Sequence, residues 1–108
     1  MDKAEEAYEA AKLKVVRARA GNTHRLNLSG GIYNALEELP PEIEQLSELQ
    51  ILVLSRTRIK SFDVLKSLKA LRYIDLEDAE ISDISWLGSV MNFVYLVWPM
   101  RVSDTVTH

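Results

Sequence analysis

The amino-acid sequence predicts an α/β solenoid, in which about four short parallel strands stack side by side behind an amino-terminal capping helix. Two observations lead to this prediction: an apolar-x-apolar core recurs four times along the chain, and an amphipathic helical pattern precedes the first of them. With 108 residues, 47% of them hydrophobic, the chain is large and apolar enough for one domain with a continuous core.

The capping helix is predicted over residues 2–20. Asp2 is placed to cap its first turn and Gly21 to end it, and acidic residues come early and basic ones late, as the helix dipole favours. A stack of repeats needs such a cover because its terminal unit otherwise exposes the core. The face expected to cover the core consists of Ala4, Ala7, Tyr8, Ala11, Val15 and Ala18.

The recurring cores are predicted to be the strands. A short strand and its turn cannot bury an apolar side alone, so units of this kind stack on one another. The cores start 26, 22 and 22 residues apart, and they are Leu26-x-Leu28, Leu52-x-Leu54, Ile74-x-Leu76 and Leu96-x-Trp98. We expect a single domain at 1–102, with repeats at 23–48, 49–70 and 71–92 and a terminal strand at 93–102, and a flexible tail at 103–108.

Two of these units resemble a known motif. The runs that begin at Leu49 and Leu71 and end at Ile59 and Ile81 are similar to the leucine-rich-repeat pattern L-x-x-L-x-L-x-x-N-x-L. The connector at 39–46 resembles the L-P-x-x-I-x-x-L stretch of bacterial members, and the later connectors resemble the helical 22-residue subtype. The resemblance covers roughly 23–100 and implies a right-handed leucine-rich-repeat solenoid, with strands on its concave face, helical crossovers outside and a role in binding another protein.

The chain departs from this pattern at two places. Thr57 and Ala79 replace the asparagine whose side chain bonds the backbone after each strand; Thr57 still offers a hydroxyl, so we expect a looser turn only at Ala79. The first unit also carries four extra residues in a loop at 30–35, where Tyr33 either packs over the core or forms a binding finger.

The residues that alternate with the buried positions are expected on the concave face of the sheet. They form two columns across adjacent strands, with tyrosine and aliphatic residues beside an arginine rim. That composition is typical of protein interfaces, although aromatic and β-branched residues also favour strands for packing alone. Asn27 begins the second column. The predicted partner-binding residues are Arg25, Ile51, Tyr73 and Tyr95 in the first column and Val53, Asp75 and Val97 in the second.

A second hypothesis concerns the carboxyl end of the stack. Pro99 follows the last strand, so Phe93, Tyr95 and Trp98 are predicted to lie on an open edge that a homodimer would hide. A third, a regulatory subunit of an enzyme, is implied only by the resemblance to the 22-residue subtype.

No enzymatic function, cofactor or metal is predicted. The chain has no cysteine and only two histidines, His24 and His108, and neither is in phase with a nucleophile. The acidic run from Asp75 lacks the spacing of a calcium loop, and Gly30 and Gly31 lack the lysine that follows in a phosphate loop.

The charge and composition also exclude classes of partner. A net charge of -3 and a pI near 5.4 argue against nucleic acid and against a membrane surface. Because the sequence shows no cysteine, no signal-like segment and no apolar run of bilayer length, we expect a cytoplasmic protein.

Overall fold

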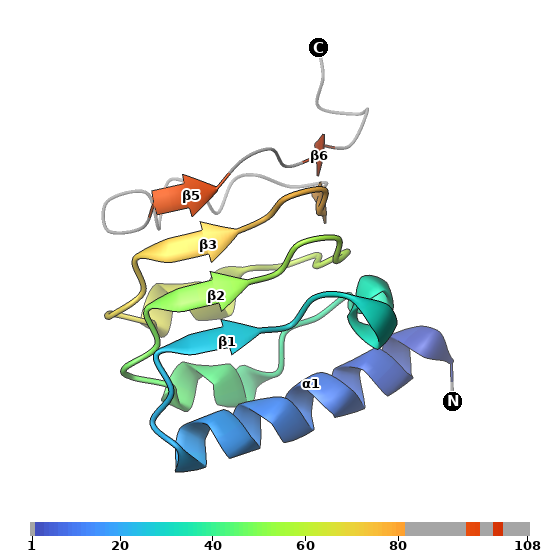
Figure 1. The fold of residues 1–108 in the computed structure, drawn as a ribbon. Coiled ribbons are helices and arrows are strands. Elements are labelled where there is room, and N and C mark those ends of the chain that lie inside the picture. Colours follow the sequence, from blue (N-terminus) through green and yellow to red (C-terminus); the bar gives the residue numbers. More distant parts are fainter. Residues whose placement is uncertain (1, 82–94, 98–100, 103–108) are drawn as a thin grey trace.

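The computed structural model describes residues 2–81, 95–97 and 101–102, with the backbone alone described at 81, 95–97 and 101–102. A parallel sheet in the order β1-β2-β3-β5 stacks above the helix α1, which confirms the predicted α/β class (Figure 1). The elements are α1 (Lys3–Ala20), β1 (Arg25–Asn27), η1 (Gly31–Ala35), η2 (Pro41–Gln45), β2 (Ile51–Val53), η3 (Asp63–Ser67), β3 (Tyr73–Asp75), β4 (Glu80–Ile81), β5 (Tyr95–Val97) and β6 (Arg101–Val102), where η marks a 3₁₀-helix.

The helix α1 begins and ends where the sequence predicts. The side chain of Asp2 accepts a hydrogen bond from the Glu5 N–H at 2.8 Å, and the Glu5 carboxylate accepts one from the Asp2 N–H at 3.3 Å. This reciprocal capping box satisfies two N–H groups that a helix start leaves without partners. At the other end, the N–H of Gly21 bonds to the Arg17 carbonyl at 3.2 Å, and Asn22 turns the chain with a positive φ of 51°.

One face of α1 closes the end of the stack. Ala7, Ala11 and Val15 are completely buried, and Tyr8 and Ala18 are partly buried against the same core, as predicted. Ala4, the remaining residue of the predicted face, is half-buried and lies outside this core cluster. Small side chains at the centre let the helix approach closely. Burial of these apolar side chains removes their surface from water, so this face of α1 covers the core of the first repeat.

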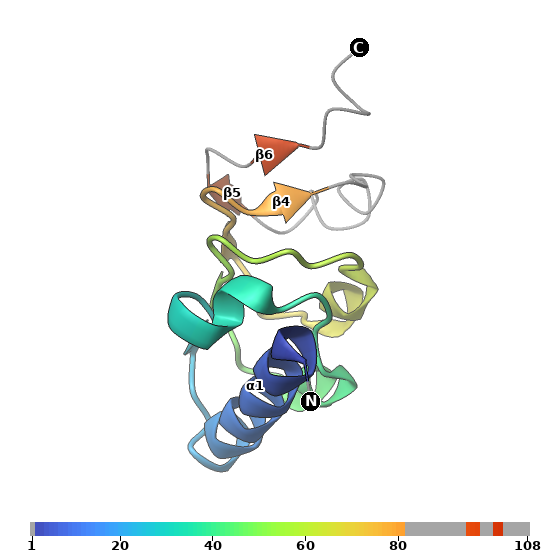
Figure 2. The ribbon, with the colours of Figure 1, turned by 90° about the vertical axis from the view of Figure 1, so that its right-hand side faces the viewer.

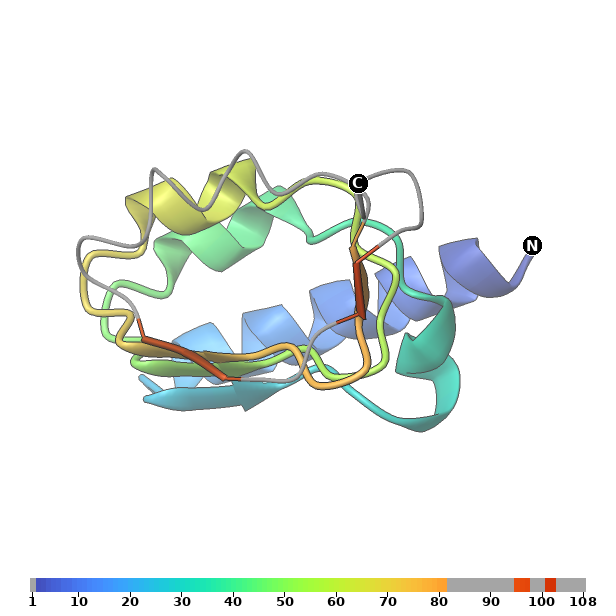
Figure 3. The ribbon, with the colours of Figure 1, turned by 90° about the horizontal axis from the view of Figure 1, so that it is seen from above.

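The crossovers lie opposite the sheet, with the core between the two walls. Figure 3 shows η2 and η3 on the side away from the strands. Ile43 of η2 and Leu65 of η3 are both completely buried, which is why these short helical turns hold to the stack. The expected helical crossovers are thus confirmed as 3₁₀-helices for the first two units, whereas the third connector and the predicted tail lie outside the described residues.

The repeat period sets the strand register. Leu26 pairs with Leu52, Leu52 with Ile74, and Ile74 with Leu96, so the apolar positions that recur in the sequence lie side by side in the sheet. Since side chains alternate between the two faces of a strand, the row formed by Leu26, Leu52 and Ile74 points into the core from β1 to β3.

The turns after β2 and β3 each contain a residue in the left-handed conformation. Arg56 has φ of 62° and Asp78 has φ of 57°, and the two are 22 residues apart. The N–H of Arg56 donates to the Glu77 carbonyl at 2.9 Å, which ties one turn to the next. A left-handed conformation costs a residue with a side chain roughly 1–2 kcal/mol, and Asp tolerates it better than Arg.

Thr57 and Ala79 follow these left-handed residues, and their contacts correct the prediction of a looser turn at Ala79. Thr57, 1% exposed, donates its hydroxyl to the Leu54 carbonyl at 2.7 Å, as expected. Ala79 has no such group, yet its turn is not looser: its N–H bonds to the Leu76 carbonyl at 3.0 Å, and Glu80 donates to the Thr57 carbonyl at 2.9 Å. Backbone groups therefore satisfy one another where the side chain is missing.

The extra residues of the first unit form the 3₁₀-helix η1. Tyr33 is partly buried against the core, and the Lys14 ammonium lies 5.4 Å from the centre of its ring. The packing alternative for Tyr33 is therefore confirmed over the binding finger. Gly30 and Gly31 have positive φ values of 82° and 54°, which explains why two glycines stand at this bend.

The edge strand β1 has its outward carbonyls occupied by side chains. Lys14 donates its ammonium to the Asn27 carbonyl, and Thr23 donates its hydroxyl to the Arg25 carbonyl at 2.9 Å. Unpaired groups on an edge strand invite pairing with another chain, so these two side chains protect the amino-terminal edge.

A second row of pairing follows the turns. In Figure 2, β4 and β6 lie side by side, and their register pairs Glu80 with Arg101. The Arg58 guanidinium lies 3.9 Å from the Glu80 carboxylate, an exposed pair that contributes little stability. Among the residues described, none of the helices is long and apolar enough to cross a bilayer.

Candidate functional site

The side of the sheet turned away from the core, which we term the sheet face, gathers the two predicted columns. The register pairs Arg25 with Ile51, Ile51 with Tyr73, and Tyr73 with Tyr95. Neighbouring strands in a sheet lie about 4.8 Å apart, so these positions form one continuous row. The second column follows in the same way through Asn27, Val53, Asp75 and Val97.

The first column contains an exposed aromatic side chain. Tyr73 is 44% exposed, whereas Ile74, the next residue along β3, is completely buried. Ile51 beside it is half-buried and Arg25 is exposed. Because this row lies on the open side of the sheet, the tyrosine ring and the isoleucine present apolar surface to solvent, with an arginine at one end.

In the second column, the expected exposure of Val53 is wrong. Val53 is only 7% exposed, and the register places it between Asn27 and Asp75. The buried core cluster of the described residues does not include Val53, so this residue keeps its place in the second column but offers little surface to a partner.

The polar members of the second column hold the turns that follow them. Asn27 accepts from the Ser29 N–H at 3.0 Å through its side-chain oxygen, and the Asp75 carboxylate accepts from the Glu77 N–H at 3.0 Å. Short polar side chains readily accept hydrogen bonds from the backbone two residues further on. This tendency of Asn and Asp is visible in the sequence, but the alternation of buried and exposed positions does not reveal it. Asp75, half-buried, therefore has a structural role besides any contact with a partner.

Charges separate toward the two ends of the strands. Arg25 and Arg72, both exposed, lie where β1 and β3 begin, whereas the exposed Glu77 and Asp78 follow the end of β3. Arg56 is the basic exception on the acidic side. A partner therefore meets a basic rim, an apolar centre and a mainly acidic rim as it crosses the sheet face.

The predicted carboxyl edge is only partly within the described residues. β5 is the last strand of the four-stranded sheet and pairs with β3 through Tyr95 and Val97. Phe93 and Trp98, the other two residues of the predicted self-association edge, lie outside the described residues.

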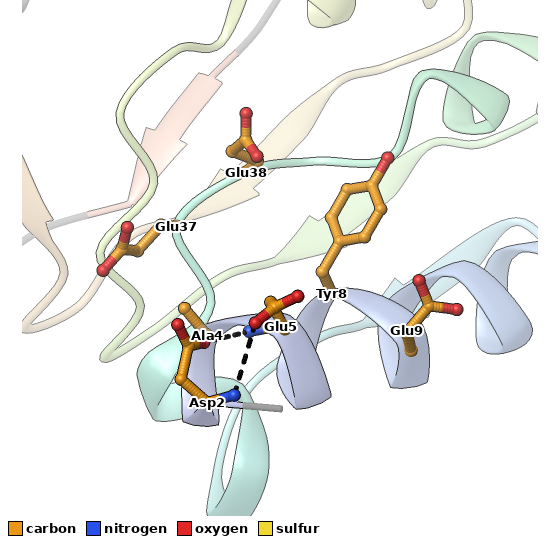
Figure 4. A pocket seen from close by; sticks show the side chains of 7 residues that line it. All are labelled: Asp2, Ala4, Glu5, Tyr8, Glu9, Glu37 and Glu38. Atoms are coloured by element: carbon orange, nitrogen blue, oxygen red, sulfur yellow. Dashed lines mark hydrogen bonds between the residues drawn. The ribbon is translucent and has the colours of Figure 1, made fainter.

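An acidic hollow lies near the start of α1. It encloses about 220 Å³, and Figure 4 shows side chains from α1 and from the segment after η1 lining it. Asp2 and Glu5 are already engaged in the capping box. Within the described part of the chain, no three His, Asp or Glu side chains lie close enough together to hold a metal ion. The lining residues are Asp2, Ala4, Glu5, Tyr8, Glu9, Glu37 and Glu38.

The outer side of α1 carries an exposed apolar surface that belongs to neither of the two predicted binding sites. Leu13 and Val16 on the outer side of α1 are 53% and 55% exposed, more than any large hydrophobic residue of the described sheet. The signal was present in the sequence, because both positions fall outside the predicted core face of the helix.

The fold is a small repeat scaffold, and its sheet face carries the exposed side chains of Arg25 and Tyr73. Residues 47–89 match the family Leucine Rich repeats (2 copies), so this stretch contains leucine-rich repeats. It spans β2, η3, β3 and β4, the units in which the 22-residue period is strictest. Leucine-rich-repeat domains generally act in protein interaction and are typically without catalytic activity. No curated protein matches the chain.

Proposed function

We propose that the chain is a protein-interaction module that binds a partner through the sheet face, with Ile51, Tyr73 and Tyr95 as central anchors. The observation that carries the proposal is the exposed ring of Tyr73, in register between an isoleucine and a second tyrosine. Arg25 extends the row and Asp75 borders it.

The composition of this surface supports the proposal. Tyrosine and arginine are enriched among the residues that dominate protein interfaces, because they bury large areas and still form hydrogen bonds. A rigid sheet also limits the conformational entropy that binding removes. Val53 and Val97 complete the proposed surface, with Val53 as a largely buried member.

Affinity capture from the lysate of the source cells tests the proposal. Tyr73→Ala is expected to weaken binding of the captured protein about 30-fold, as at interface hot spots. Lys66→Ala is the matched control, because Lys66 is an exposed residue of η3 on the opposite wall of the stack. Should Tyr73→Ala and Tyr95→Ala both retain every protein that the wild type captures, the sheet face is not the binding surface.

A second candidate is self-association through the carboxyl edge, with Phe93, Tyr95 and Trp98 at the contact. The position of β5 as the last strand of the four-stranded sheet supports it. Light scattering on wild type and Trp98→Glu tests this candidate: a dimer that the substitution dissolves supports it, and a dimer of unchanged mass contradicts it.

The remaining features of the proposal come from the sequence. A bacterial type of repeat rests on the L-P-x-x-I-x-x-L resemblance at 39–46, and a cytoplasmic setting rests on the absence of cysteine. A non-enzymatic role follows from the lack of any paired nucleophile and base in the sequence pattern. Regulation of an enzyme is one form that protein binding would take, suggested only by the resemblance.

A further inference from the structure

The outer side of α1 carries two large apolar side chains in contact with solvent. Leu13 and Val16, 53% and 55% exposed, are three residues apart and point away from the face formed by Ala7 and Ala11. Figures 1 and 2 show α1 at the end of the stack, with no other labelled element on its outer side. Nothing in the cap function of the helix requires apolar residues at these positions.

Charged residues stand on both sides of Leu13 along the same stripe. Glu9 lies four residues before it and Arg17 four residues after it, so both flank Leu13 on the outer side of the helix, Glu9 toward the acidic hollow and Arg17 toward β1. Glu9 and Arg17 are both exposed. Within residues 2–81, neither forms an ion pair with another described side chain.

The charges of Glu9 and Arg17 on two copies of α1 attract each other only when the two helices run antiparallel. We infer that α1 of two chains pack antiparallel about a two-fold axis at Leu13, forming a homodimer. Leu13 then contacts Leu13 of the partner subunit, and Glu9 lies opposite Arg17 of the partner subunit, because both are four residues from the axis. A parallel arrangement would place like charges together. Val16 and Ala10, each three residues from the axis, meet in the same way.

The size of the contact predicts a weak dimer. A helix of 18 residues is about 27 Å long, and two such helices bury an area at the low end of specific interfaces, below about 1,200 Å² in total. We therefore expect a dissociation constant in the micromolar to millimolar range, rising with ionic strength because the two ion pairs are exposed. Ile51 and Tyr73 stay accessible, since β1 separates them from α1 in the stack, whereas Arg25 borders the same hollow as Leu13 and Arg17.

Sedimentation velocity on the full chain over a range of concentrations tests the dimer. Leu13→Gln is expected to raise the dissociation constant at least about tenfold, with a far-UV spectrum that matches the wild type. Glu9→Arg and Arg17→Glu are each expected to weaken the dimer similarly, because like charges then face each other. The double variant restores opposite charges at both contacts and is expected to return within about threefold of the wild type.

Three outcomes overturn the inference. The first is a wild type that stays monomeric up to about 1 mM, above the range expected for such a contact. The second is a dimer that Leu13→Gln leaves unchanged. The third is a double charge variant that fails to recover while both single variants remain folded. A dimer that responds only to Trp98→Glu assigns the association to the carboxyl edge instead, and Lys66→Ala, at an exposed position of η3, serves as the control that affects neither contact.

Discussion

At the scale of single residues, the turns after the strands show how one position is filled by different chemistry in successive repeats. Thr57 bonds the Leu54 carbonyl through its hydroxyl, whereas Ala79 depends on backbone bonds alone. Both are buried and both follow a left-handed residue. The turn geometry is therefore common to the repeats, and the side-chain bond is an added stabilisation in one of them.

Replacing Thr57 with valine keeps its volume and removes this bond. The free energy of unfolding is expected to fall by about 1 kcal/mol, the usual net value of a buried neutral hydrogen bond. Urea denaturation followed by circular dichroism measures the change. Ser67→Ala, at an exposed position of η3, is the control and should leave the midpoint within experimental error. A variant as stable as the wild type would show that the Leu54 carbonyl needs no hydroxyl.

Replacing Arg56 with glycine is expected to stabilise the protein. Its φ of 62° is costly for arginine but not for glycine, and the relief of roughly 1–2 kcal/mol exceeds the added backbone entropy of roughly 0.5–1 kcal/mol. The thermal midpoint should therefore rise. Arg72→Gly, at a position without a positive φ, is the control and should lower it. A loss of stability in Arg56→Gly would mean that the arginine side chain stabilises the turn by contacts of its own.

At the scale of elements, α1 shows what the sequence pattern captures. Its cap residues, its end at Gly21 and its core face all follow from short-range spacing, and the structure places them as expected. The strand columns follow as well, because an in-phase period fixes the register. Exposure within a column does not follow, because alternation fixes only the face of a side chain: Val53 shares a column with the exposed Asn27 and is itself only 7% exposed.

The close approach of α1 to the first repeat predicts intolerance to larger residues. Ala11 is completely buried, so Ala11→Leu should force the helix outward and cost about 1–3 kcal/mol of unfolding free energy. Ala20→Leu, on an exposed position of the same helix, is the matched control and should be nearly neutral. Denaturant titration of both variants at low protein concentration checks the difference. Equal stability would indicate that α1 shifts without strain.

At the scale of the whole molecule, each unit contacts mainly its neighbours, so stability should depend on the number of stacked units. The regular 22-residue step from Leu52 to Ile74 means that an added unit of that length keeps every column aligned. Repeats could be recognised from the sequence for this reason, whereas the positions of η1 and Tyr33 depended on contacts with α1 that no period encodes.

Inserting a second copy of residues 49–70 after residue 70 tests this dependence. The longer chain is expected to keep its fold and to unfold with a larger denaturant slope, because more surface becomes exposed on unfolding. A 21-residue insertion that lacks one residue of the copy is the control, and it should destabilise the chain by shifting apolar side chains to the wrong face. An unchanged slope for the 22-residue insertion would show that the added unit does not join the stack.

The occupied carbonyls of β1 have a further consequence for assembly. A filament built by strand addition needs a donor edge on one molecule and an acceptor edge on the next, repeated without end. Lys14 and Thr23 close the amino-terminal edge, so head-to-tail growth has no acceptor there. Strand pairing through the opposite edge alone would therefore join two molecules and stop there, because α1 and the turn before β1 supply the side chains that occupy the first edge.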